Sequence, residues 1–276
     1  MPRRDYMANY ETKEKLLKLS ENFLQKARDA NCFFDISKQF KKNRSERYDE
    51  MSISSAFYSY TDNAITVAVI MELSKLYDTS KQSINIKKFL DICYENRGLF
   101  PQQKELTLKK YGTEDKMILP YTRTVSTDEK DFFKNEIDNL SELESLIING
   151  DNPLRVEMTI DRYFQLFYWK YDNLKTKIDY LIKQRNKVYA HNDEDKLFKI
   201  DEIVNKYPLH YNDTESLISY ALEVIGFSIA LLTDVNIAEL PNNIDDWTYT
   251  LDLVRDGLKY QKEKFEEEFG EGSFFE

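Results

Sequence analysis

The chain has 276 residues and a net charge of −10, with only 7 glycines and 6 prolines. This length allows one large domain or two small ones, and the shortage of turn-forming residues favours long helices. Aromatic residues make up 14% of the chain, which is enough large apolar surface to exclude a protein that is disordered throughout. The composition therefore predicts an all-α protein.

The cysteines and the apolar segments indicate the cellular compartment in which we expect the protein. Cys32 and Cys93 are far apart in the sequence, so they form neither a disulfide framework nor a metal knuckle, and a reducing cytoplasm is the default. No apolar run follows the basic residues at the N-terminus, and the longest apolar stretches run to about nine residues, whereas a membrane span needs about 20. We expect a soluble cytoplasmic protein that does not bind a membrane.

The negative charge is unevenly distributed. Residues 201–276 hold 17 acidic and 5 basic side chains, whereas residues 1–200 hold 32 acidic and 34 basic ones. The first 200 residues are therefore compatible with a polyanionic partner, although the salt dependence of its binding would be shallower than for a strongly basic protein.

Apolar periodicity predicts two helices in the first third of the chain. The first runs from Tyr10 to about Lys42, and the basic run KKNRSER that follows at 41–47 is expected to be a solvated connector or a phosphate contact. The second, from Ser52 to Tyr77, is apolar on several sides, so we expect it to be buried among other helices. A shorter helix should end near Gly98, where a glycine can cap it.

The middle of the chain is less regular. Residues 99–125 carry two prolines and no sustained period, which predicts an irregular insert, long for a compact domain. Ser126 and Glu129 have the spacing of a capping box and predict a helix start. A long helix is expected from about Pro153 to about His191.

Shorter and longer helices are predicted in the C-terminal part. A short helix should lead to Pro208, Asp213 should cap the next helix, and a last helix should span about 245–269. His210 lies in the predicted turn with no histidine or cysteine near it in sequence, so we expect it to be structural.

The long helix carries an apolar seam that an arginine interrupts. Seam positions follow alternating spacings of three and four residues: Phe164, Phe167, Tyr171, Leu174, Ile178, Leu181, Arg185 and Val188. A guanidinium is expensive to bury unless it is paired. The Arg185 guanidinium should therefore pair with a carboxylate, extend to solvent at the end of its aliphatic side chain, or line a solvent-filled site.

His191 is the second unusual residue of this helix. It lies six positions after Arg185, which on a straight helix is about 240° of rotation and about 9 Å of rise. The two side chains would meet only if the helix unwinds near Ala190 or if a second copy of the chain brings its own set. The alternative is a C-terminal capping histidine that the helix dipole favours in its charged form.

Together with Asn186, these residues match the needs of RNA cleavage. The reaction takes a proton from the ribose 2′-hydroxyl, gives one to the leaving 5′-oxygen and stabilises charge on phosphorus oxygens. His191 can transfer protons near neutral pH, the fork of Arg185 can hold two phosphate oxygens, and Asn186 can orient a hydroxyl or the imidazole. Lys183, Lys187 and Tyr189 are candidate RNA-binding residues. No metal or other cofactor is required.

The signature of the HEPN superfamily resembles one run of this sequence, Arg185-Asn186-Lys187-Val188-Tyr189-Ala190-His191. The surrounding sequence, at about 50–260, is similar to AbiU-type abortive-infection proteins. The resemblance implies a helical bundle with long antiparallel helices that dimerises around both motifs, and metal-independent endoribonuclease activity leaving a 2′,3′-cyclic phosphate. It also implies a role in phage defence or as a toxin. Residues 1–276 would then form one domain, with an N-terminal helix and basic connector at 1–48 and the HEPN-like bundle at 49–270.

Two other functions remain open at this stage. The same helical dimer could bind a nucleotide or a protein as a scaffold without cleaving RNA. It could also be a toxin that a cognate antitoxin or another regulatory protein silences. The expected partners are thus RNA, a second copy of the chain and such a regulator.

Overall fold

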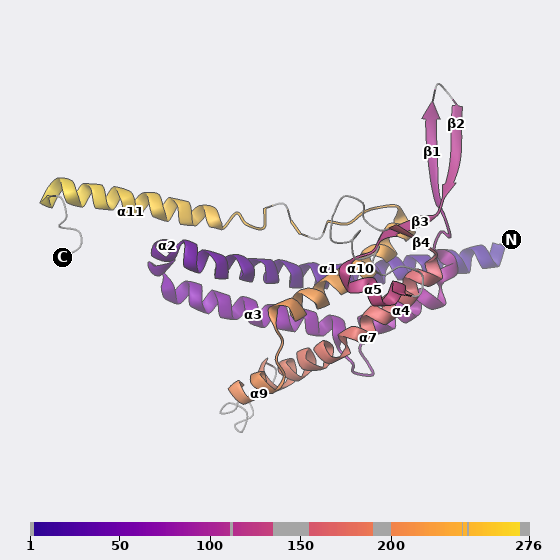
Figure 1. Cartoon of the computed structure of the whole chain (residues 1–276), viewed down its shortest axis with the longest axis horizontal. Coiled ribbons are helices and arrows are strands. Elements are labelled where there is room, and N and C mark those ends of the chain that lie inside the picture. The colour runs from indigo at the N-terminus through magenta and orange to yellow at the C-terminus, as the bar shows by residue number, and fades with distance from the viewer. Residues whose placement is uncertain are drawn as a thin grey trace. The chain divides into compact units, whose positions relative to one another are not determined.

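The computed structural model describes residues 3–110, 113–134, 155–189, 200–238, 240–241 and 243–270, and Figure 1 labels its elements. Most of these residues are helical, which confirms the expected all-α bundle. The helices before the first strand are α1 (Arg3–Glu46), α2 (Tyr48–Ser52), α3 (Ser55–Tyr77), α4 (Ile86–Glu95) and the 3-10 turn η1 (Arg97–Leu99). The later ones are the 3-10 turn η2 (Thr127–Glu129), α5 (Lys130–Phe133), α7 (Ile160–Gln184), the π-helical turn η4 (Arg185–Tyr189), α9 (Ile200–Lys206), α10 (Tyr211–Thr233) and α11 (Thr248–Phe269).

The chain forms two compact units. Unit 1 comprises Met1–Leu24, Tyr77–Asp179 and Ser219–Ile237, and unit 2 comprises Gln25–Leu76, Tyr180–Ile218 and Ala238–Glu276. The prediction that 1–276 is one domain stays a prediction.

Aromatic side chains fill the core of unit 1. Phe227 of α10 lies 5.1 Å from Phe167 and 6.0 Å from Phe164 of α7, measured between ring centroids, and Phe100 packs on Phe164 at 5.8 Å. Such tilted and edge-to-face contacts suit the charge distribution of aromatic rings. The apolar seam predicted on α7 is buried from Phe164 to Leu181, so it faces the protein's own core.

Helix α4 shows how local sequence sets an element of unit 1. The side chain of Asn85 accepts a hydrogen bond from the backbone N–H of Lys88 at 2.9 Å and caps the helix start. The apolar residues that follow share one face at helical spacing, and all are buried: Ile86, Phe89, Leu90 and Cys93. Burial raises the pKa of Cys93 to about 12, so this thiol stays protonated at neutral pH and is unsuited to be a nucleophile.

The insert at 99–125 is not irregular, which corrects the prediction. Strands β1 (Lys104–Lys110) and β2 (Thr113–Leu119) pair antiparallel with Lys104 opposite Leu119. Strand β3 (Tyr121–Thr124) pairs antiparallel with β4 (Arg155–Met158). Pro101 and Pro120 flank the hairpin, where a residue without an N–H donor costs no ladder bond. The prolines delimit strands here, and each strand is too short for its period to stand out.

A ring of four charged side chains, of which Glu129 is buried and the others are partly buried, ties β3 to the helices of unit 1. The Nε and Nη2 atoms of Arg123 contact the two carboxylate oxygens of Glu129, with Nε to Oε2 at 3.0 Å, and the Lys170 ammonium lies 2.6 Å from the same carboxylate. Glu223 of α10 closes the ring on Lys170 at 2.8 Å and on Arg123. Glu129 has no solvent-exposed surface. Two cations and two carboxylates therefore neutralise one another in the interior.

Glu129 also completes the capping box predicted from the sequence. Its carboxylate accepts a hydrogen bond from the Ser126 backbone N–H at 3.4 Å, just before η2 and α5. Burial alone would raise the pKa of Glu129, but hydrogen bonds from Arg123 and Lys170 outweigh it and lower the pKa below its ordinary value of 4.5.

In unit 2 the helices α1 and α3 run antiparallel. Phe40 lies 5.8 Å from Tyr58 between ring centroids, and the Ser37 hydroxyl is 3.5 Å from the Asp62 carboxylate. Positions earlier on α1 thus meet positions later on α3. Helix α11 begins against α1, where Trp247 stacks on Phe40 at 4.6 Å.

Several predicted boundaries were wrong. The basic run at 41–47 is not a solvated connector: α1 continues to Glu46, and Arg47 forms an ion pair with Asp252 at 2.8 Å. The long helix α7 starts at Ile160, not near Pro153, because β4 comes first and the Thr159 hydroxyl accepts a hydrogen bond from the Arg162 backbone N–H at 3.2 Å.

The prediction that the second helix is covered on all sides was also wrong. The C-terminal half of α3 is buried, but its N-terminal half exposes large apolar side chains, with Phe57 62% and Tyr60 77% exposed. Periodicity shows which residues are apolar, and only the arrangement of neighbouring helices decides which of them are covered.

Helix α10 is long and apolar enough to cross a membrane if length and composition are considered alone, with a mean hydropathy of 1.7. However, 56% of the same segment is buried inside the protein, and a core helix gives the same signal.

Candidate functional site

The helix that carries the predicted motif changes geometry where the motif begins. Helix α7 ends at Gln184, and Arg185–Tyr189 continue as the π-helical turn η4. Such insertions into an α-helix are rare and frequently mark functional sites. The apolar seam is fully buried at Leu181 but only half-buried at Arg185. The arginine therefore sits at the end of the dry seam, where its side chain reaches solvent.

Arg185 and Asn186 contact each other directly. The Arg185 Nε–H donates a hydrogen bond to the Asn186 Oδ1 at 2.9 Å, and Asn186 is exposed. We expected Asn186 to orient a hydroxyl or the imidazole, and here it orients the guanidinium. This bond occupies one edge of the fork and sets the direction of the planar group, which pre-organises it for binding phosphate oxygens.

Two of the predicted residues are not fully described. His191 lies outside the described residues, so the distance between its imidazole and the Arg185 guanidinium stays a prediction. Tyr189 ends the π turn, but its side chain is not described. Lys183 and Lys187 are both described and half-buried.

The structure gathers these two lysines with a third around one tyrosine. The ring centroid of Tyr207 lies 4.8 Å from the Lys183 ammonium, 5.0 Å from that of Lys187 and 5.7 Å from that of Lys206. We call this group the Tyr207 cluster. Sequence analysis missed Lys206 and Tyr207, although the Lys206-Tyr207-Pro208 run, a cation and an aromatic before a proline, was visible in the sequence.

The Tyr207 cluster follows from helix periodicity and one buried amide. Tyr180, Lys183, Gln184 and Lys187 are spaced three and four residues apart, so they share one face. The Gln184 side chain is buried, and its Nε2 donates a hydrogen bond to the Tyr207 carbonyl oxygen at 2.6 Å. The Tyr180 ring packs against the Tyr207 ring, with centroids 5.9 Å apart.

The lysines change the acidity of this tyrosine. Burial would raise the pKa of Tyr207, but a hydrogen bond with Lys187 and the charges of Lys187, Lys206 and Lys183 lower it below the ordinary value of 10.0. The phenolic oxygen thus lies in a region of positive potential.

His210 has the structural position expected for it. Its backbone N–H donates a hydrogen bond to the Asp213 carboxylate at 2.9 Å, and its carbonyl oxygen accepts one from the Thr214 backbone N–H at 3.1 Å. Helix α10 begins at Tyr211, so Asp213 is not the N-cap residue that we predicted. It lies in the first turn, and its side chain bonds back to the residue that precedes the helix. Among the residues that the structure describes, no group of three or more histidine, cysteine, aspartate or glutamate side chains could hold a metal ion.

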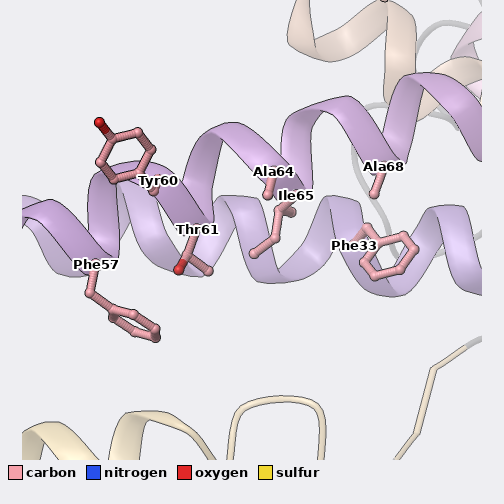
Figure 2. Close-up of a pocket in the computed structure, with 7 residues that line it drawn as sticks. All are labelled: Phe33, Phe57, Tyr60, Thr61, Ala64, Ile65 and Ala68. Atoms are coloured by element: carbon pink, nitrogen blue, oxygen red, sulfur yellow. The ribbon is translucent and has the colours of Figure 1, made fainter.

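Unit 2 also has an apolar hollow, which Figure 2 shows. It has a volume of about 620 Å³ and lies on α1 and the exposed half of α3. Its lining residues are Phe33, Phe57, Tyr60, Thr61, Ala64, Ile65 and Ala68. Exposed apolar surface of this kind is typical of protein contacts.

The helical bundle agrees with the fold that the resemblance to HEPN proteins implied. A family model described as AbiU2 matches residues 13–250, and the chain therefore belongs to the AbiU2 family of HEPN proteins. No curated protein and no solved structure shows significant similarity to the chain.

Proposed function

We propose that the protein is a metal-independent endoribonuclease that acts in abortive infection or as a toxin. Membership of the AbiU2 family supports the link to abortive infection. The observation that carries the proposed chemistry is the pair of Arg185 and Asn186, joined at 2.9 Å on a π-helical turn beside the Tyr207 cluster. An oriented guanidinium and nearby ammonium groups suit a phosphodiester substrate.

In the proposed reaction, His191 takes the proton of a ribose 2′-hydroxyl and the 2′-oxygen attacks phosphorus. The bond from phosphorus to the 5′-oxygen breaks, and the leaving oxygen takes up a proton. The products are a 2′,3′-cyclic phosphate and a 5′-hydroxyl. Arg185 binds the charged phosphoryl oxygens, and Asn186 holds the Arg185 side chain in place. The substrate is single-stranded or looped RNA, because in-line attack requires a sugar-phosphate link outside a regular helix.

A cleavage assay on a pool of cytoplasmic RNA tests this chemistry. We expect His191→Ala to lower the rate about 10²- to 10⁴-fold, and Arg185→Ala about 10²- to 10³-fold. His210→Ala is the matched control, because its contacts at the start of α10 are made by its backbone. Cleavage by His191→Ala at the rate of the unaltered protein would refute the mechanism.

We further propose that the working form is a dimer. The seam of α7 is buried in the protein's own core from Phe164 to Leu181, so this part of the helix does not supply the contact between copies. The apolar hollow around Phe57 and Tyr60 is the better candidate, because a two-fold contact pairs the same patch on both subunits. In sedimentation, Phe57→Asp and Tyr60→Asp should be monomers, whereas Ile118→Asp on the exposed hairpin should leave a dimer. A monomeric unaltered protein would rule this out.

A scaffold that binds a nucleotide or a protein is the second candidate function, and the exposed apolar hollow favours it. The scaffold would cleave no RNA, but ligands would raise its melting temperature in a way that depends on Arg185 and not on His191. A toxin held inactive by an antitoxin would arrest growth on expression, and His191→Ala would relieve the arrest.

A further inference from the structure

The Tyr207 cluster brings together residues from two separate parts of the chain. Lys183 and Lys187 come from the end of α7 and the π turn, whereas Lys206 and Tyr207 come from the end of α9. All three ammonium groups lie within 5.7 Å of the Tyr207 ring centroid. A cation–π contact at a solvent-accessible site attracts a cation only modestly. Ammonium groups from both parts of the chain converge on this one ring, so an anion that lies over the ring is attracted by more than one of them.

The ring at the centre of the cluster is held rigidly. Gln184, which is only 5% exposed, fixes the backbone carbonyl of Tyr207. Tyr180 packs against the ring with an angle of 60° between the planes, and Pro208 restricts the backbone of Tyr207, the residue before it. The ring itself is partly exposed. A flat face of fixed orientation, surrounded by ammonium groups, suits a ligand that has a base to stack and a phosphate to neutralise.

The cluster is close to the proposed catalytic arginine in the sequence but distinct from it. Lys187 lies two positions after Arg185 on the same π turn, and Lys183 and Lys187 share a face with Gln184. Side chains two positions apart on a helical turn point to opposite sides, so the cluster and the Arg185 fork offer separate contacts to a bound strand. A negatively charged peptide would satisfy the lysines equally well, but it offers no base for the ring.

We propose that Lys183, Lys187, Lys206 and Tyr207 form a nucleotide subsite, separate from the Arg185 fork, that holds a phosphate and the adjoining base of a bound single strand. This inference rests on the proposed ribonuclease function and adds to it a substrate contact made by the end of α9. Lysine ammonium groups supply the charge that the phosphate needs, and the Tyr207 ring supplies a stacking surface that tolerates any base. The subsite thus raises affinity for single strands without selecting a sequence.

Binding of a single-stranded 2′-O-methyl oligonucleotide tests the subsite without cleavage, because that ligand has no 2′-hydroxyl to attack. Tyr207→Leu should weaken binding roughly 5- to 100-fold through lost stacking, whereas Tyr207→Phe should bind nearly as well as the unaltered protein. Lys206→Met should reduce the slope of log affinity against log salt by about 0.7, the value for one phosphate contact on a single strand. The matched control is Lys175→Met. Lys175 is an exposed lysine of α7 that pairs with Asp172 at 2.9 Å.

The outcomes separate the subsite from the proposed function. If RNA is cleaved but Tyr207→Leu and Lys206→Met bind the oligonucleotide like the unaltered protein, the subsite is wrong and the nuclease stands. If no RNA is cleaved but both variants bind more weakly, the subsite stands and the nuclease is wrong. Polyglutamate is a third ligand to compare. If it binds as tightly as the oligonucleotide, and if Tyr207→Leu weakens the binding of neither ligand, the cluster is a general anion-binding surface and the proposal is wrong. Circular dichroism confirms that each variant is folded.

Discussion

Helix α7 contributes a lysine to each of two charged groups, and the two groups differ in their surroundings. Lys170, in unit 1, lies between the carboxylates of Glu129 and Glu223 at 2.6 and 2.8 Å. Lys183, in unit 2, lies 4.8 Å from the Tyr207 ring, which two other lysines also approach. In the first group the charges cancel within the protein, whereas in the second, charges of one sign gather around an aromatic ring.

The difference shows how to separate structural from functional charge. A matched and buried network holds elements together, and removal of one member leaves an uncompensated charge. A group of like charges at a solvent-accessible position adds little to folding, but it creates a potential that an anionic ligand can use. The ring of Arg123, Glu129, Lys170 and Glu223 is therefore assigned to stability, and the Tyr207 cluster to binding.

The largest effect is expected from Glu129→Ala. This change leaves the two partly buried cations Arg123 and Lys170 with Glu223 as their one remaining partner in the ring. The free energy of unfolding should fall by about 3–5 kcal/mol, as measured by denaturant titration. Glu105→Ala on the exposed hairpin is the control and should change it by less than about 0.5 kcal/mol. An equal effect of both changes would contradict the structural assignment.

Acid should produce the next largest effect. The pKa of Glu129 in the folded protein is lowered below 4.5, so its contribution to stability is fully present above the unfolded pKa. That contribution is lost as the pH falls through the folded pKa. Unfolding of the unaltered protein should therefore become easier on acidification below about pH 4.5, and Glu129→Gln should show a shallower dependence. Parallel curves for the two proteins would argue against the carboxylate as the source.

The smallest effects should come from the Tyr207 cluster. Lys187→Met removes both a hydrogen bond and a charge that lower the pKa of Tyr207, so the pKa should rise toward 10.0. Carbon NMR of labelled tyrosines at increasing pH measures this shift, with Tyr207→Phe used to assign the signal. The free energy of unfolding should stay within about 0.5 kcal/mol of the unaltered value. A larger loss would indicate that the lysine is structural.

The sequence predicted more of the helices than of the segments between them. The buried seam from Phe164 to Leu181 and the capping box of Glu129 were confirmed, because both depend on residues within one or two turns of each other. The hairpin at 104–119 was missed because its strands are short and their pairing joins residues up to 15 positions apart. The ion ring was missed for the same reason, since Arg123 and Glu223 are 100 positions apart.

The sequence by itself determined the all-α class, the apolar seam that Arg185 interrupts and the resemblance that the family match confirmed. Only the tertiary structure decided that the lysines of α7 meet Tyr207, that the second helix leaves Phe57 uncovered, and that Glu129 lies between two cations. Helical periodicity is a property of neighbouring residues, so it can be read along the chain. Partners that a side chain meets across the fold depend on how distant segments pack, and no local pattern records that packing.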